Sequence, residues 1–161
     1  MNRRPLTIEF TGLPNSGKTT LIHNLESSLL AQGINVQIMQ EDAELVPKEI
    51  PKKTWIRNVC SKAESSSLLK ILHEMNNSFC VFPDYLFVID VSVEESLKRR
   101  YASGGDAPVL TNQEFLNFYK KELDCFYETV TCPMWYLDTS NMTIDEVKNN
   151  TLKKIMQLLD E

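Results

Sequence analysis

Residues 12–19 read Gly-Leu-Pro-Asn-Ser-Gly-Lys-Thr and match the pattern GxxxxGK[ST] at every fixed position. The six residues before them, Leu6 to Thr11, read LTIEFT and have the β-branched and apolar character of a strand. After the motif a helix is predicted from Thr19 to about Gln32, ending before Gly33, because apolar residues recur there at helical spacing: Leu21, Ile22, Leu25, Leu29 and Leu30. The motif therefore lies between a strand and a helix, the context in which it binds phosphate.

The chemistry of this loop follows from its residue types. Its glycines let the backbone curl so that amide groups point inward at phosphate oxygens, and the start of the helix adds a positive dipole end. Lys18 is expected to reach the β and γ phosphates, and the Thr19 hydroxyl to bind magnesium. The pattern thus predicts a site for a nucleoside triphosphate and Mg²⁺, formed by Gly12, Pro14, Asn15, Ser16, Gly17, Lys18, Thr19 and Thr20. A lysine facing an empty site would pack against nothing, so we expect it to add little stability without nucleotide.

Strands and helices alternate along the rest of the chain. Strands are predicted at residues 36–39, at Tyr85 to Ile89 before Asp90, and at residues 134–137. Three later helices are predicted from pairs of a hydroxyl residue and a glutamate three positions on, which are Ser92 with Glu95, Thr111 with Glu114, and Thr143 with Glu146. This order predicts an α/β domain with a parallel sheet covered by helices and a ligand site at the carboxyl ends of the strands.

Composition limits the partners. The chain has 161 residues, 42% of them hydrophobic, which fits a single domain over residues 1–161. The net charge of -5 has the wrong sign for a protein that binds nucleic acid or an anionic membrane. No apolar run approaches the ~20 residues that span a bilayer, and the N-terminus lacks the apolar stretch of a signal peptide, so we expect a cytoplasmic protein. The four cysteines form no CxxC pair, which favours reduced packing residues over a zinc site.

Other users of this loop carry additional motifs. A GTPase would need NKxD and DxxG, and a transporter ATPase would need LSGGQ; none of these strings occurs. The segments FTGLPNSGKTTL, QEDAELVP, PDYLFVIDVSVEESLKRR and YLDTSNMTIDEV together resemble the thymidylate kinase and deoxynucleoside kinase group of P-loop proteins, including relatives described only as ATP-binding or AAA-family proteins. The resemblance implies a three-layer P-loop NTPase fold with sheet order 2-3-1-4-5.

The resemblance also implies roles for residues outside the phosphate-binding motif of residues 12–19. Glu41 and Asp42 match the acidic residue that follows strand two and faces the acceptor, where a carboxylate can orient the attacking oxygen or hold a magnesium-bound water. The alternative is that these acids only solvate a loop. Arg57 matches a cation for an acceptor phosphate, or it lies on a solvated helix face.

Two further segments match the family pattern. Arg99 and Arg100 precede a glycine-rich stretch and match the lid, expected at about residues 99–112, whose arginines neutralise charge during phosphoryl transfer. Complementarity to the helix dipole would also favour arginines there. Thr139, Ser140 and Asn141 match the loop that borders adenine, although the first two could simply form a turn before Thr143.

One family feature is missing. Strand three, with its acidic residue for the magnesium water, has no counterpart, because too few residues separate Asn77 from Tyr85 for a parallel crossover. Three explanations stay open: residues missing between Ser78 and Phe79, a truncated inactive relative, or Asp90 as the magnesium acid. We favour the first.

Together these observations predict an ATP-dependent kinase of the P-loop phosphotransferase class, a transferase that uses Mg²⁺ and moves the γ-phosphoryl of ATP to a nucleoside, a nucleotide or a small phosphorylated metabolite. The alternative is a nucleotide-binding switch or pseudokinase without acceptor turnover, and a GTPase is disfavoured. We expect no nucleic acid or membrane partner, and assembly as a homodimer stays open.

Overall fold

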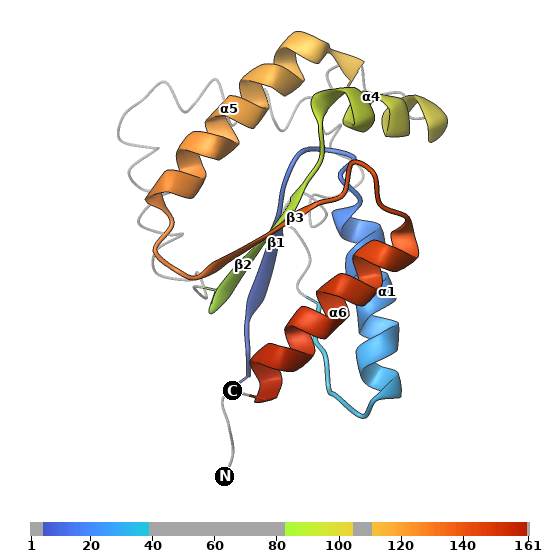
Figure 1. Ribbon diagram of the computed structural model, residues 1–161, viewed down its shortest axis with the longest axis vertical. Coiled ribbons are helices and arrows are strands. Elements are labelled where there is room, and N and C mark those ends of the chain that lie inside the picture. The colour runs from blue at the N-terminus through green and yellow to red at the C-terminus, as the bar shows by residue number, and fades with distance from the viewer. Residues whose placement is uncertain (1–4, 39–82, 105–110, 161) are drawn as a thin grey trace, which may run out of the picture. The chain divides into compact units, whose positions relative to one another are not determined.

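Three parallel strands form the sheet in the part of the chain that this computed structural model describes, which is residues 5–38, 83–104 and 111–160 (Figure 1). The chain divides into two compact units, residues 1–36 with 83–161 and residues 37–82, and all elements below lie in the first. The predictions for Glu41, Asp42, Arg57 and the Ser78–Phe79 junction fall outside the described residues. The expectation of a single domain over residues 1–161 stays a prediction.

The strands are β1 (Ile8–Thr11), β2 (Tyr85–Asp90) and β3 (Met134–Asp138), in the order β1-β2-β3. Thr11 is paired with Val88, and Asp90 with Asp138, so the strands end at one edge of the sheet. The apolar run of β2 is buried because both faces of the central strand are covered. This order corresponds to strands 1, 4 and 5 of the expected sheet, and the α/β parallel architecture is confirmed.

Helices cover the two faces of β2. On one face Phe87 and Ile89 pack against α1 (Lys18–Ala31) and α6 (Ile144–Asp160), which lie side by side in Figure 1. On the other face Leu86 and Val88 pack against Tyr127 of α5 (Gln113–Thr129). Because successive residues of a strand point to opposite faces, one apolar run supplies both halves of the core.

Two of the three predicted helix caps are confirmed. α4 (Val93–Ala102) begins after Ser92, whose Oγ accepts a hydrogen bond from the Glu95 amide, and Thr143 with Glu146 caps α6 in the same way. The prediction for Thr111 is wrong: the cap of α5 is Asn112, whose Oδ1 accepts from the Phe115 amide. The side-chain oxygen of asparagine accepts a hydrogen bond from a first-turn backbone N–H as well as a hydroxyl does. The sequence alone therefore does not decide which of two adjacent capping residues, Thr111 or Asn112, caps the helix.

The strand predicted at residues 36–39 is not formed over residues 36–38, and Met39 lies outside the described residues. A strand needs a ladder partner, and in the described ranges β1 pairs only with β2. Val36 instead packs, partly buried, against the core cluster of α1 and α6. None of the described helices is both long and apolar enough to cross a membrane.

Candidate nucleotide-binding site

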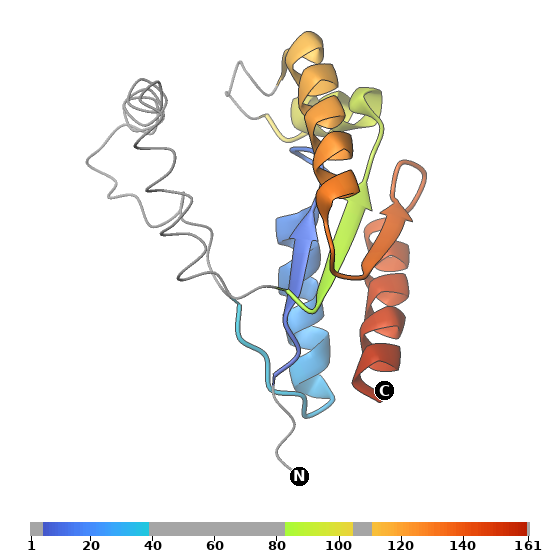
Figure 2. The same ribbon diagram turned by 90° about the vertical axis from the view of Figure 1, so that its left-hand side faces the viewer.

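The phosphate loop, residues 12–17, joins β1 to α1 where the strands end, at the end of the sheet that also carries α4 (Figure 2). Gly12 is buried with φ +144°, and a Cβ atom there would collide with the carbonyl oxygen of Ile89. Asn15 and Gly17 also have positive φ, at 60° and 94°. Gly17 caps α1 without a side-chain hydrogen bond, so the loop offers backbone amides to an anion.

Lys18 turns back onto this loop. Its Nζ donates to the carbonyl oxygens of Gly12 at 3.0 Å and Leu13 at 2.9 Å, and to Ser16 Oγ at 3.3 Å. The expectation that this lysine adds little stability without nucleotide is therefore wrong in its reasoning, because the ammonium ties together carbonyls of the loop. Charge-assisted hydrogen bonds of this kind are among the stronger ones in proteins.

Two polar side-chain atoms, one in the loop and one on α4, are buried without a partner in the described part of the chain. They are Nδ2 of Asn15 and Nε of Arg100. Arg100 lies one helical turn after Ser96, and the Ser96 hydroxyl contacts the loop at Pro14, so both side chains lie on one face of α4. A buried donor without a partner lowers the stability of the fold, and an anionic ligand would supply the acceptor that each of these two donors lacks. Thr19 and Thr20 are exposed in the first turn of α1.

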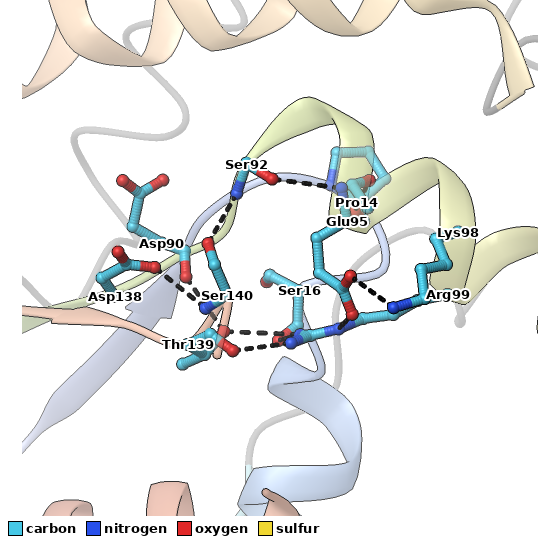
Figure 3. Close-up of polar contacts among 11 residues, drawn as sticks. Pro14, Ser16, Asp90, Ser92, Glu95, Lys98, Arg99, Asp138, Thr139 and Ser140 are labelled. Carbon is cyan, nitrogen blue, oxygen red and sulfur yellow. Dashed lines mark hydrogen bonds and ion pairs between the residues drawn. The ribbon is translucent and has the colours of Figure 1, made fainter. Parts of the chain in front are cut away.

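Arg99 is held by three segments of the chain (Figure 3). Its Nε donates to Glu95 at 3.1 Å, one terminal nitrogen donates to the Ser16 carbonyl at 3.2 Å, and the other donates to the Thr139 carbonyl at 2.7 Å. The hydrogen bond from Arg99, followed by that from Lys98, lowers the pKa of Glu95 below its ordinary value. The guanidinium therefore links α4, the phosphate loop and the loop after β3.

The loop after β3 forms a turn, as the plainer interpretation of the sequence has it. The amide and Oγ1 of buried Thr139 both donate to the Asp90 carbonyl at 2.9 Å, so this hydroxyl faces the sheet. The Ser140 amide donates to Asp138, and the hydrogen bonds from Ser140 lower the pKa of that carboxyl. Ser140 Oγ accepts from the Ser92 amide, which joins this loop to the start of α4.

A cavity of about 430 Å³ lies between this loop and α4. Polar side chains surround it, and those that line it are Ser92, Glu94, Glu95, Lys98, Ser140 and Asn141. Two of the three residues expected to border adenine therefore line a cavity, whereas Thr139 does not. The contributions of Glu94 and Lys98 were missed by sequence reasoning, although their spacing on one helix face was a usable signal.

Comparison with known sequences gives two matches. A family model described as adenylylsulphate kinase matches residues 4–53, which include the phosphate loop. The probable thymidylate kinase of Methanococcus aeolicus is 34% identical over 84 residues, covering 50% of this chain and 42% of that protein, so the chain matches less than half of this relative's length.

Solved structures of deoxyadenosine kinase from M. mycoides have the same fold. The structure with bound dCTP has a TM-score of 0.66 at 16% identity, covering 94% of this chain and all of the other. The structure with bound dATP has a TM-score of 0.61 at 14% identity, covering 96% and 99%. These comparisons confirm the resemblance to the P-loop nucleoside and nucleotide kinase group and its α/β fold.

Proposed function

We propose that this chain, which has the fold and the loop motif of the P-loop nucleoside and nucleotide kinase group, transfers the γ-phosphoryl of ATP to a nucleoside, a nucleotide or a similar small acceptor. The observation that carries the proposal is the phosphate loop, where positive φ values at Asn15 and Gly17 and the lack of a side-chain cap on α1 leave amides for an anion. The names of the similar proteins, thymidylate kinase and deoxyadenosine kinase, support the acceptor class.

ATP would be held at both ends. Its phosphates would lie on the loop amides and Lys18, with Asn15 Nδ2 and Arg100 Nε gaining the partners they otherwise lack. The adenine would occupy the cavity lined by Ser140, Asn141 and Lys98, where amide and hydroxyl groups can meet the base edge. Arg100 is then the better placed arginine for the predicted lid role, since Arg99 is bonded to backbone carbonyls of both loops.

The described residues fit a magnesium ion held mainly by substrate. Thr19 supplies an exposed hydroxyl oxygen beside the loop, a hard donor suited to Mg²⁺. In the described ranges no three His, Cys, Asp or Glu side chains are grouped to hold a metal, so phosphate oxygens and waters would complete the coordination. When bound, the ion neutralises charge on the β and γ phosphates.

The transfer itself is a displacement at phosphorus. The acceptor oxygen bonds to the γ phosphorus as the bond to the β–γ bridging oxygen breaks, and ADP leaves with that electron pair. The proton of an acceptor hydroxyl passes to a carboxylate, for which the resemblance favours Glu41 or Asp42. Lys18 and Arg100 stabilise the negative charge that spreads over the transferred group.

A coupled ADP assay with a panel of nucleosides, nucleoside monophosphates and small phosphorylated metabolites tests the proposal. We expect one acceptor class to raise ADP release by orders of magnitude over slow hydrolysis, because positioning and electrostatics supply most of this catalysis. Lys18→Met should abolish the increase, and Lys153→Met, at an exposed position of α6, should preserve it. Tight ATP binding with no stimulating acceptor would contradict the kinase and favour a nucleotide-binding switch.

A further inference from the structure

Helix α4 donates hydrogen bonds to two carbonyl groups of the phosphate loop. The hydroxyl of Ser96, which is fully buried, donates to the Pro14 carbonyl at 2.8 Å. Arg99 donates from a terminal nitrogen to the Ser16 carbonyl at 3.2 Å. Ser96 and Arg99 are three positions apart, which places them on neighbouring parts of one helix surface. Helix α4 therefore holds the loop at two carbonyl groups, those of Pro14 and Ser16.

The position of these carbonyls fixes the direction of the amides. A trans peptide is planar, so a carbonyl and the amide of the next residue point in opposite directions. A Pro14 carbonyl turned toward α4 turns the Asn15 amide the other way, and the Ser16 carbonyl does the same for the Gly17 amide. Asn15 and Gly17 are the two loop residues after Gly12 with positive φ, the backbone state that makes adjacent amides converge on an anion.

We propose that Ser96 and Arg99 are positioning residues that aim the Asn15 and Gly17 amides at a bound polyphosphate. The inference rests on the proposed function for the identity of the ligand, and it gives α4 a role that acts through the loop backbone. Arg99 in particular works through the Ser16 peptide instead of touching phosphate.

The surroundings of Arg99 suit this role. Glu95 and Thr139 accept three further hydrogen bonds from the guanidinium, with Thr139 Oγ1 at 3.4 Å from the same nitrogen that reaches Ser16. Thr139 is itself fully buried and bonded to the Asp90 carbonyl. The guanidinium is thus immobilised before any ligand arrives, and ordering it costs nothing at the moment of binding. A lysine lacks the planar fork needed to reach both loops at once.

Amide directions can be measured directly without a ligand. Residual dipolar couplings of the Asn15 and Gly17 N–H groups would be compared between the full-length protein and the variants Ser96→Ala, Arg99→Met and Arg99→Lys. Ser28→Ala and Lys153→Met serve as controls, since the Ser28 hydroxyl donates to the Asn24 carbonyl of its own helix and Lys153 is exposed on α6. Calorimetric titration with inorganic tripolyphosphate, which has no base, then measures the loop alone.

We expect Ser96→Ala to rotate the Asn15 amide and Arg99→Met to rotate the Gly17 amide, each with tripolyphosphate binding weakened about 10-fold, the effect of one misdirected charge-assisted hydrogen bond. Arg99→Lys should fall between the wild type and Arg99→Met, and both controls should match the wild type. Should Ser96→Ala fail to fold, the two arginine variants still decide the question at Gly17.

Unchanged couplings in the folded variants would overturn the inference, as would changed couplings with unchanged tripolyphosphate affinity. A wild type that binds neither tripolyphosphate nor ATP would overturn both this inference and the proposed function. A wild type that binds tripolyphosphate and shows the expected variant effects, yet turns over no acceptor, would contradict the kinase while supporting the positioning role.

Discussion

The Nζ atom of Lys120 on α5 lies 2.9 Å from Oδ1 of Asp90, the last residue of β2. The same oxygen accepts a hydrogen bond from the Val91 amide at 2.9 Å. Asp90 shares a sheet face with Leu86 and Val88, the face that α5 covers, so its carboxylate points toward that helix. One hypothesis from the sequence is that Asp90 holds the magnesium-bound water in place of the missing acidic residue. In the structure this carboxylate is already in an ion pair with Lys120.

Loss of this ion pair should cost little stability. Asp90 and Lys120 are 40% and 33% exposed, so solvent screens their attraction, and we expect Asp90→Asn or Lys120→Met to lower the free energy of unfolding by about 0.5 to 1 kcal/mol in urea denaturation. The double variant should lose little more than either single one. Asp124→Asn is the control, because Asp124 lies 4.0 Å from the same ammonium and is 59% exposed.

Asp90→Asn should also leave the magnesium dependence of ATP binding unchanged, because the carboxylate points toward α5, and Lys120 and the Val91 amide already bond to its Oδ1 atom. Titration of ATP at several Mg²⁺ concentrations checks this. A marked loss of the magnesium effect in Asp90→Asn, absent from Lys120→Met, would instead support Asp90 as the magnesium acid.

Gly12 should be the least replaceable glycine described. Alanine at this position would have a strained φ of +144° and a Cβ atom against the Ile89 carbonyl, so we expect Gly12→Ala to lower the free energy of unfolding by about 3 kcal/mol and to abolish tripolyphosphate binding. Gly33→Ala is the matched control, since its φ is +77° but its Cβ would meet open space. That variant should lose only about 1 kcal/mol and keep its affinity. Equal losses would refute the steric argument.

The features predicted correctly from sequence are those set by neighbouring residues. The glycine positions of residues 12–17 and the apolar run of β2 each specify local backbone or burial, and the structure confirms the strand, loop and helix around them. The Schellman-type end of α1 is likewise local, with Gly33 at positive φ and the Ile34 amide bonded to the Leu29 carbonyl.

The features that sequence reasoning missed depend on contacts between distant segments. Ser96 and Pro14 are 82 positions apart, and Arg99 and Ser16 are 83 apart, so no periodicity or spacing could associate them. Ser96 resembles any small polar residue of a helix until its burial is known. The inward turn of Lys18 is local in sequence, but it depends on which carbonyls the folded loop presents, and a motif pattern does not contain that information.

Lys18→Ala should now affect stability as well as binding. Since Nζ bonds to two loop carbonyls and Ser16 Oγ, we expect a loss of about 1 to 2 kcal/mol in the free energy of unfolding without nucleotide, together with loss of the ATP-induced rise in Tm. Urea denaturation and thermal shift measure the two effects, with Lys153→Ala as the control. An ATP-induced rise that survives in Lys18→Ala would remove the lysine from the phosphate site.

The pKa of Glu95 provides a test of the contacts around Arg99 that is independent of nucleotide. The hydrogen bond from Arg99 is the largest cause that lowers this pKa, and the hydrogen bond from Lys98 comes next. A ¹³C NMR titration of the Glu95 carboxyl should therefore show a larger rise of its pKa in Arg99→Met than in Lys98→Met.

The same contacts make stability depend on pH. The folded pKa of Glu95 lies below the unfolded one, so Glu95 stabilises the fold above its unfolded pKa, and this stabilisation is lost as pH falls through the folded value. In Arg99→Met the two values approach each other, and acid should remove less stability through this group. Glu146 is the internal control, because its pKa is lowered by Thr143 and should stay constant in both variants. An equal change in the two variants would show that Arg99 does not hold Glu95 as the structure has it.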